Sequence, residues 1–168
     1  IEIIMNGGGF YCKIVTKNGK KKKKQLFNSK TKIPQSHMEA AYVYANLSYC
    51  KRRKVGCVIV KHNSIIAIGY NGTNPGEVNN CEDEDGQTLH DVRHAEDNAL
   101  RKLTKSPNDA DGSIVFVTTA PCKGCASRIV DAGVVKVFYN VVYKNTDGLE
   151  YLKKHGVEIE EITITEKE

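Results

Sequence analysis

The stretch that decides the fold runs from residue 94 to residue 125 and reads HAEDNALRKLTKSPNDADGSIVFVTTAPCKGC. Its pattern predicts a helix over about 93–105 and a β-branched strand over 114–118. A second helix is expected over 121–132, where Gly133 ends it, followed by a strand over 135–139. Two strands joined through a helix indicate a parallel pair.

The flanking segments extend this unit to a complete domain. They predict a helix over 37–49 capped by Ser36, hairpin strands over 55–61 and 64–70, a helix over 147–155 and a strand over 157–164. The expected fold is a three-layer α/β/α arrangement with a mixed five-stranded sheet. Residues 71–91 form a long loop rich in Gly, Asn and acids, and such loops in compact domains are usually functional.

Length and charge place the chemistry in one domain. A chain of 168 residues, 40% hydrophobic and 27% charged, suits a single globular core. The net charge of +5 comes from residues 1–35, which hold nine lysines and one acid, whereas residues 36–168 hold 16 basic and 19 acidic side chains. We therefore divide the chain into a basic N-terminal extension of uncertain origin, 1–35, and a domain over 36–168. A nucleic-acid partner is not expected.

The extension allows two interpretations. A strand-like run at 10–16, the turn signal Asn18-Gly19 and the lysines at 20–24 fit a hairpin with a solvated basic edge. The alternative is an artificial or poorly ordered addition, since five consecutive lysines repel one another. We assign it no chemistry.

The six cysteines point to metal or redox chemistry. No apolar leader follows the N-terminus and no apolar run reaches bilayer-spanning length, so the sequence predicts a soluble, cytoplasmic chain with no membrane partner. In a reducing compartment closely spaced cysteines are more often metal ligands or redox thiols than disulfides. Cys122 and Cys125 are the pair of interest.

One imidazole and two thiolates make a three-ligand metal set. His94 and the Cys122–Cys125 pair open the two predicted helices, and three protein ligands leave the fourth tetrahedral position of Zn²⁺ open, as in catalytic zinc sites. A lone C-x-x-C can be a redox pair, and a lone His-x-Glu occurs often by chance. Their joint occurrence favours a zinc site. The pattern H-x-E…P-C-x-x-C is similar to the signature of zinc nucleobase deaminases, in which the Glu moves protons.

Glu96 is the candidate catalytic residue. Two thiolates and a neutral histidine cancel the formal charge of zinc, so this metal acidifies water less than an all-histidine site does. A carboxylate beside the metal compensates. Glu96 would act first as a base toward the attacking water and then as an acid toward the ring nitrogen and the leaving ammonia. Free N–H groups at the helix start would stabilise the thiolates.

Three segments carry a closer resemblance: SYCKRRKVGC at 48–57, GYNG at 69–72 and HAEDNA at 94–99. Together, in this order, they resemble deoxycytidylate (dCMP) deaminases, particularly the bacteriophage and bacterial members, over about residue 35 to the end. The resemblance implies hydrolysis of dCMP to dUMP and ammonia for dTTP precursor supply, in the host cytoplasm if the chain is viral. It also implies His94, Cys122 and Cys125 as zinc ligands and Glu96 as proton shuttle.

The resemblance implies substrate contacts as well. Asn71 would bind the sugar, main-chain groups at Ala95, Thr119 and Ala120 would read the pyrimidine, and Tyr143 would line the pocket. A monophosphate also needs cationic partners. The turn before the first domain strand offers arginines and a lysine, and we expect contacts from Ser48, Arg52 and Lys54. Surface turns are also often basic for solubility alone.

The same family suggests regulation. Its members are homo-oligomers, often hexamers, activated by dCTP and inhibited by dTTP with Mg²⁺, and the effector would bind at 71–80. Cys50, Cys57, Cys81 and His90 could form a second metal site, although a free buried cysteine is the commoner state of each. Asp97, where relatives often carry an uncharged residue, has no explanation from sequence.

Two rival functions share the zinc motif. A polynucleotide deaminase would need a basic groove with stacking aromatics, whereas residues 36–168 carry a net negative charge and no tryptophan. The lysine run at 20–24 is the feature that keeps this rival open. A non-catalytic nucleotide-binding regulator on the same fold is the second rival, and it predicts metal without turnover.

Overall fold

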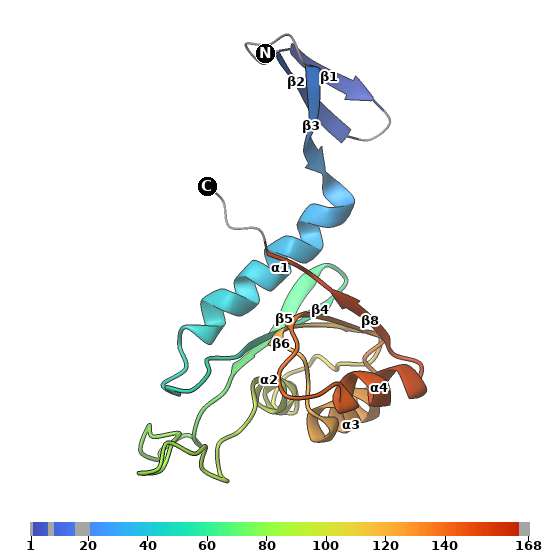
Figure 1. Cartoon of the computed structure of the whole chain (residues 1–168). Coiled ribbons are helices and arrows are strands. Elements are labelled where there is room, and N and C mark those ends of the chain that lie inside the picture. The colour runs from blue at the N-terminus through green and yellow to red at the C-terminus, as the bar shows by residue number, and fades with distance from the viewer. Residues whose placement is uncertain (1, 7–8, 16–20, 165–168) are drawn as a thin grey trace. The chain divides into compact units, whose positions relative to one another are not determined.

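The computed structural model describes the backbone of residues 2–6, 9–15 and 21–164, and side chains from 32 to 164 (Figure 1). The chain divides into two compact units, Ile1–Ser36 and His37–Glu168. The elements in chain order are β1 (Glu2–Asn6), β2 (Gly9–Val15), β3 (Lys21–Asn28), α1 (Ser29–Ala45), β4 (Gly56–Lys61), β5 (Ser64–Tyr70), α2 (Ala95–Leu103), β6 (Ile114–Thr119), α3 (Lys123–Asp131), β7 (Lys136–Val141), α4 (Asp147–Lys154) and β8 (Glu158–Glu161). No described helix has the length and apolarity that a bilayer-spanning segment needs.

The first unit contains a small antiparallel sheet in the order β1-β2-β3. Val15 pairs with Lys21 and Lys13 with Lys23, which joins the strand-like run to the lysine run as in the hairpin alternative. The Asn18-Gly19 turn lies outside the described residues.

The second unit is built on a mixed five-stranded sheet in the order β5-β4-β6-β7-β8. Strand β4 runs antiparallel to β5 and β6, whereas β6, β7 and β8 are parallel. The mixed sheet and the parallel pair joined through a helix are as predicted.

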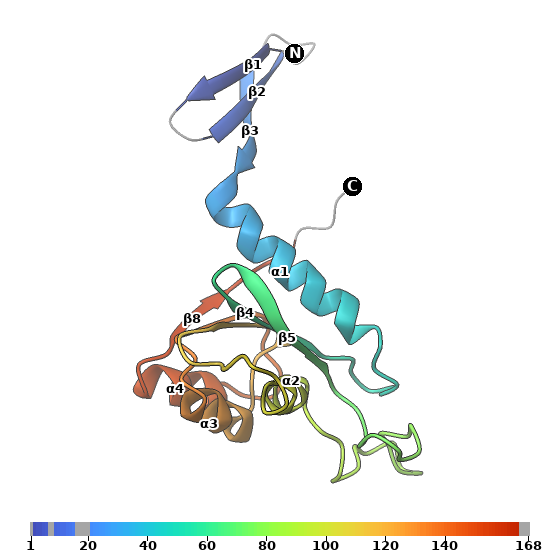
Figure 2. The ribbon, with the colours of Figure 1, turned by 180° about the vertical axis from the view of Figure 1, so that it is seen from behind.

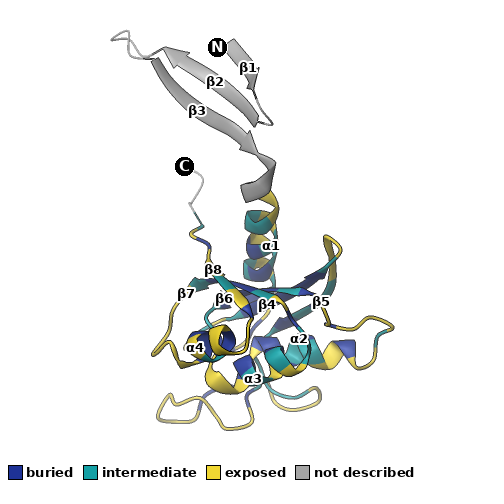
Figure 3. Ribbon diagram, turned by 90° about the vertical axis from the view of Figure 1, so that its right-hand side faces the viewer, coloured by how far each residue is buried: buried dark blue, intermediate teal, exposed yellow. Residues whose placement is uncertain are grey.

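Helix α1 lies on one face of the sheet and helices α2, α3 and α4 lie on the other (Figures 2 and 3). Alternating side chains of the strands build one core on each face. On one face Val115, Val117 and Val137 pack with residues of α2, α3 and α4. On the other face Phe116 and Phe138, whose ring centroids lie 4.8 Å apart, pack with Met38 and Ala41 of α1. The three-layer prediction is thus confirmed.

The first domain helix was predicted wrongly at both ends. Helix α1 spans Ser29–Ala45 rather than 37–49. The segment before Ser36 is polar and contains Pro34, so it shows no apolar periodicity that marks a helix start. At the other end, Leu47 N–H and Ser48 N–H bond to the carbonyls three residues back, which tightens the chain into a turn that ends the helix. The remaining boundaries differ by at most three residues.

Close backbone approaches bring the helices onto the sheet and onto one another. A Cβ at Gly69 on β5 would lie 2.1 Å from the Ala95 carbonyl oxygen at the start of α2. A Cβ at Gly148 on α4 would lie 1.9 Å from the carbonyl oxygen of Pro121, just before α3. Only glycine permits these approaches, which fix the starts of α2 and α3.

Candidate active site

The three predicted metal ligands converge at the starts of two helices. His94 is the N-cap residue of α2 and Cys122 that of α3, both with extended backbone, and Cys125 lies in the first turn of α3. The Sγ atoms of Cys122 and Cys125 lie 3.5 and 3.3 Å from His94 Nδ1. All three ligand atoms fall within 4.8 Å of one another, so one ion could contact them all.

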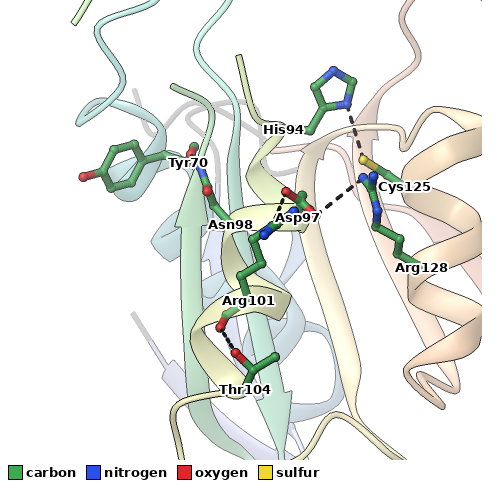
Figure 4. Close-up of polar contacts among 8 residues, drawn as sticks. All are labelled: Tyr70, His94, Asp97, Asn98, Arg101, Thr104, Cys125 and Arg128. Atoms are coloured by element: carbon green, nitrogen blue, oxygen red, sulfur yellow. Dashed lines mark hydrogen bonds and ion pairs between the residues drawn. The ribbon is translucent and has the colours of Figure 1, made fainter. Parts of the chain in front are cut away.

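Asp97 ties the two helices that carry these ligands. Its buried carboxylate accepts a 2.8 Å hydrogen bond from Arg101 Nε on its own helix, and its other oxygen lies 3.5 Å from Arg128 Nη1 on α3 (Figure 4). The link sets the spacing between the helix that provides His94 and the helix that provides the cysteines. This is the structural reason for Asp97 that the sequence alone did not reveal.

The electrostatics of the cluster favour a bound cation. Hydrogen bonds with Cys125 and His94 lower the pKa of Cys122 to about 3, so this sulfur is a thiolate at neutral pH. The hydrogen bond to the Cys122 sulfur, together with burial, raises the pKa of Cys125. A nitrogen and two sulfurs around one point form the donor set that Zn²⁺ prefers, so the residues fit this metal.

Glu96 lies beside the cluster and is only 4% exposed. Burial raises the pKa of its carboxyl, and neighbouring His94 opposes this shift. A carboxyl with a raised pKa holds a proton more readily near neutral pH, as proton transfer in both directions requires. The position therefore suits the predicted shuttle.

A cavity of about 460 Å³ opens over Glu96, a size suited to a small-molecule ligand. It is lined by Cys50, Arg52, Arg53, Val55, Asn71, Glu82, Gln87, Thr88, Val92, His94, Ala95, Glu96, Thr119, Ala120, Pro121, Cys122, Tyr143, Lys144 and Asn145. Segments far apart in sequence thus share one site.

Most predicted substrate contacts lie in this cavity. Those that line it are Arg52, Asn71, Ala95, Thr119, Ala120 and Tyr143. Ser48 and Lys54 are not among the lining residues. The buried Ser48 hydroxyl donates to the Asn71 carbonyl at 2.8 Å, and Lys54 is exposed.

The Asn71 side chain is engaged with the turn before β4. Its Oδ1 accepts the Val55 N–H and its Nδ2 donates to the Arg53 carbonyl, both at 2.8 Å. Asn71 therefore holds the backbone of the basic turn at the cavity wall, and part of its hydrogen-bonding capacity is used there.

Two cationic side chains beside Tyr143 were not selected from the sequence. Arg53 lies over the Tyr143 ring with its Cζ 4.0 Å from the ring centroid, and its Nη1 donates to Thr119 Oγ1 at 3.4 Å. The Nζ atom of Lys144 lies 5.4 Å from the centroid of the same ring. The basic composition of the turn predicts a cationic group at the site. Because the turn has no helical or strand periodicity, its sequence does not indicate which side chain enters the cavity.

Cys50 and Cys81 form a disulfide, which corrects two expectations. Neither is a free cysteine, and the pair is not part of a second metal site with Cys57 and His90. Cys57 is buried in the sheet core, whereas the His90 side chain is fully exposed beside Asp91. The bond joins residues 31 apart, so no local pattern could indicate this pairing.

Comparison with known proteins agrees with this geometry. Residues 31–141 match the family described as the cytidine and deoxycytidylate deaminase zinc-binding region, which is more than half of the chain. The chain belongs to the cytidine and deoxycytidylate deaminase family. Its members include a deoxycytidylate deaminase of Saccharomyces cerevisiae, 33% identical over 77% of this chain and 45% of that protein, so this chain spans less than half of that relative. A phage T4 deoxycytidylate deaminase is 28% identical over 73% of this chain and 86% of its own length.

Among solved structures, the dCMP deaminase of cyanophage S-TIM5 in complex with dCMP and dUMP has a TM-score of 0.78. It is 46% identical and covers 80% of this chain and all of that one. This cytidine-deaminase-like similarity confirms the predicted fold.

Proposed function

We propose that this deaminase-family chain hydrolyses dCMP to dUMP and ammonia. The observation that carries the proposal is the convergence of His94, Cys122 and Cys125 beside buried Glu96, on the wall of a cavity that also holds cationic groups. The cyanophage relative holds dCMP and dUMP in its crystal structure, which supports the choice of substrate.

His94, Cys122 and Cys125 hold zinc in this proposal. When bound, zinc supplies Lewis acidity toward the water that attacks the ring carbon bearing the amine. Glu96 receives a proton on its carboxylate and passes protons to the ring nitrogen and then to the departing amine. A C–O bond forms, the C–N bond breaks, and one water is consumed for each ammonia released.

The rest of the cavity orients the nucleotide. Main-chain groups at Ala95, Thr119 and Ala120 face the pyrimidine, and Asn71 stabilises the turn beside the sugar. Arg53, held against Tyr143 and Thr119, and Lys144 supply the charge that a 5′-phosphate needs. Arg52 lines the same wall of the cavity. Lys54 and Ser48 lie outside the cavity lining, where Ser48 supports the backbone of Asn71.

The direct test is an assay of purified zinc-loaded protein with dCMP, following ammonia or dUMP. Deoxycytidine and CMP serve as controls for the phosphate and sugar requirements. Turnover of dCMP that exceeds turnover of deoxycytidine supports the proposal. Metal binding without turnover would favour the regulator instead, and faster turnover of a short oligonucleotide would favour the polynucleotide deaminase.

Regulation and assembly extend this proposal. In this proposal the protein is a cytoplasmic homo-oligomer, and specifically a hexamer. It is activated by dCTP and inhibited by dTTP with Mg²⁺, and the effectors bind at residues 71–80. The mostly exposed segment 74–80 belongs to the same loop as several residues that line the cavity. This continuity supports a structural connection between the effector site and the substrate cavity. Titrating dTTP and Mg²⁺ against the deamination rate tests it, and an unchanged rate at saturation would remove it.

A further inference from the structure

Glu82 is a buried carboxylate in the cavity that the proposed chemistry does not use. It follows Cys81 of the disulfide, and it forms an isolated bridge with Thr88 that closes a turn in the long loop. The residue is only 7% exposed and lines the same cavity as Asn71 and Arg53. An ionised side chain so deeply buried needs hydrogen-bond partners to offset its lost hydration.

One of its two oxygens is satisfied by the basic turn. Glu82 Oε1 accepts the backbone N–H of Lys51 at 2.9 Å and that of Arg52 at 3.0 Å. These two bonds fix the carboxylate against the segment that delivers Arg53 to the cavity. The second oxygen, Oε2, is buried and has no partner among the residues with described side chains.

The neighbouring donors are directed elsewhere. The Arg52 guanidinium donates to Thr88 Oγ1 at 3.2 Å, and the Arg53 guanidinium lies on Tyr143 and Thr119. Asn71 Nδ2 donates to the Arg53 carbonyl. The cavity lining thus includes a carboxylate that is held at Oε1 by two backbone N–H groups and whose Oε2 is free to accept a hydrogen bond from a ligand.

The chemistry of a nucleotide narrows the choice of donor. Its phosphate is an anion that a buried carboxylate repels, and its exocyclic amine must lie at the Glu96 end, where it is cleaved. The sugar hydroxyl is the remaining donor. A hydroxyl bound to a charged acceptor contributes more than a neutral pair does.

Building on the proposed function, we propose that Glu82 Oε2 accepts a hydrogen bond from the 3′-hydroxyl of the substrate sugar and thereby selects free mononucleotides. A nucleotide inside a polynucleotide has a phosphodiester at that position. It offers no donor and would place a second anion beside the buried carboxylate. One side chain therefore provides sugar recognition and excludes nucleic acid.

The experiment compares kcat/KM for three substrates: dCMP, 2′,3′-dideoxycytidine 5′-monophosphate and deoxycytidine 3′,5′-bisphosphate. Wild-type protein is expected to prefer dCMP over the dideoxy analogue by roughly 10- to 100-fold. Glu82→Gln keeps an oxygen for the two backbone N–H groups, loses the charge and gains a donor. It should shrink that preference to about threefold and improve the bisphosphate relative to dCMP by about tenfold or more.

Glu84→Gln is the matched control, since Glu84 is exposed in the same loop and does not line the cavity. It should retain the wild-type preferences. A structural role for Glu82 would lower kcat/KM for all three substrates equally, and this outcome would overturn the proposal.

Wild-type protein that treats dCMP and the dideoxy analogue alike would also overturn it, and that comparison needs no variant that must fold. Failure of the proposed function is recognised separately, because wild-type protein would then not deaminate dCMP at all.

Discussion

The two ends of the cavity are built in different ways. At the metal end, His94, Cys122 and Cys125 lie at helix starts packed on the sheet, and glycine contacts with the Ala95 and Pro121 carbonyls fix those starts. At the nucleotide end, the turn at 50–55 and the loop at 71–91 are joined by the Cys50–Cys81 disulfide and by side-chain bonds to backbone. Reactivity therefore depends on regular structure, whereas recognition depends on a few long-range links.

The largest effect is expected from Glu96→Gln, which should abolish the chemistry at the metal end and leave the rest of the cavity unchanged. The variant cannot exchange a proton, so kcat for dCMP should fall by roughly 10²- to 10⁴-fold. Zinc content, measured by elemental analysis, should stay at the wild-type level because Glu96 is not a ligand. An active variant would remove Glu96 from the mechanism, and loss of zinc would give it a structural role instead.

Breaking the disulfide should weaken substrate binding at the nucleotide end and leave zinc binding at the metal end unchanged. It closes a loop of 31 residues, so the Cys81→Ser variant should lose about 3–4 kcal/mol of unfolding free energy in the chain-entropy description. Denaturant unfolding measures this loss, and KM for dCMP should rise while zinc content stays constant. The control is a phosphine reductant, which should reproduce the effect in wild-type protein and do nothing to the variant. Zinc loss in the variant would show that the ends are not independent.

Arg53→Ala tests recognition at the level of one side chain. Losing a charged hydrogen-bond donor to the phosphate should lower kcat/KM for dCMP by roughly 10- to 100-fold. Activity on deoxycytidine, which lacks the phosphate, should change little. Lys51→Ala is the matched control, because the exposed Lys51 uses only its backbone N–H at this site. Equal losses on both substrates would assign Arg53 to the fold of the turn.

The smallest effect is expected at the surface ion pair of Lys61 and Asp109, whose residues line neither end of the cavity. The hydrogen bond and charge of Lys61 lower the pKa of Asp109 below its usual 3.8. A lowered pKa means that the ionised form stabilises the fold above about pH 3.8 and that this contribution disappears as pH falls through the folded-state pKa. Asp109→Asn should therefore differ slightly in stability from wild type at pH 7 and converge with it in acid, with activity unchanged. A difference that grows in acid would contradict this sign.

The same contrast explains what the sequence could predict. Helix starts at His94 and Cys122, the parallel strand pair around Cys122 and the ligand set follow from local patterns, because capping positions and apolar periodicity are local properties. The disulfide, Arg53 and Glu82 lie in segments without periodicity, and their partners are 30 or more residues away. Asp97 is similar, since its role depends on Arg128 of another helix.

The placement of the ligands on two helices, 28 residues apart between His94 and Cys122, couples zinc supply to folding. An unfolded chain does not bring His94 to the cysteines, so an ion that binds this cluster binds the native state and shifts the unfolding equilibrium by mass action. At a thousandfold excess over its dissociation constant, that ion adds about 4 kcal/mol. The survival of the protein against heat and proteolysis thus becomes a measure of how much free metal surrounds it.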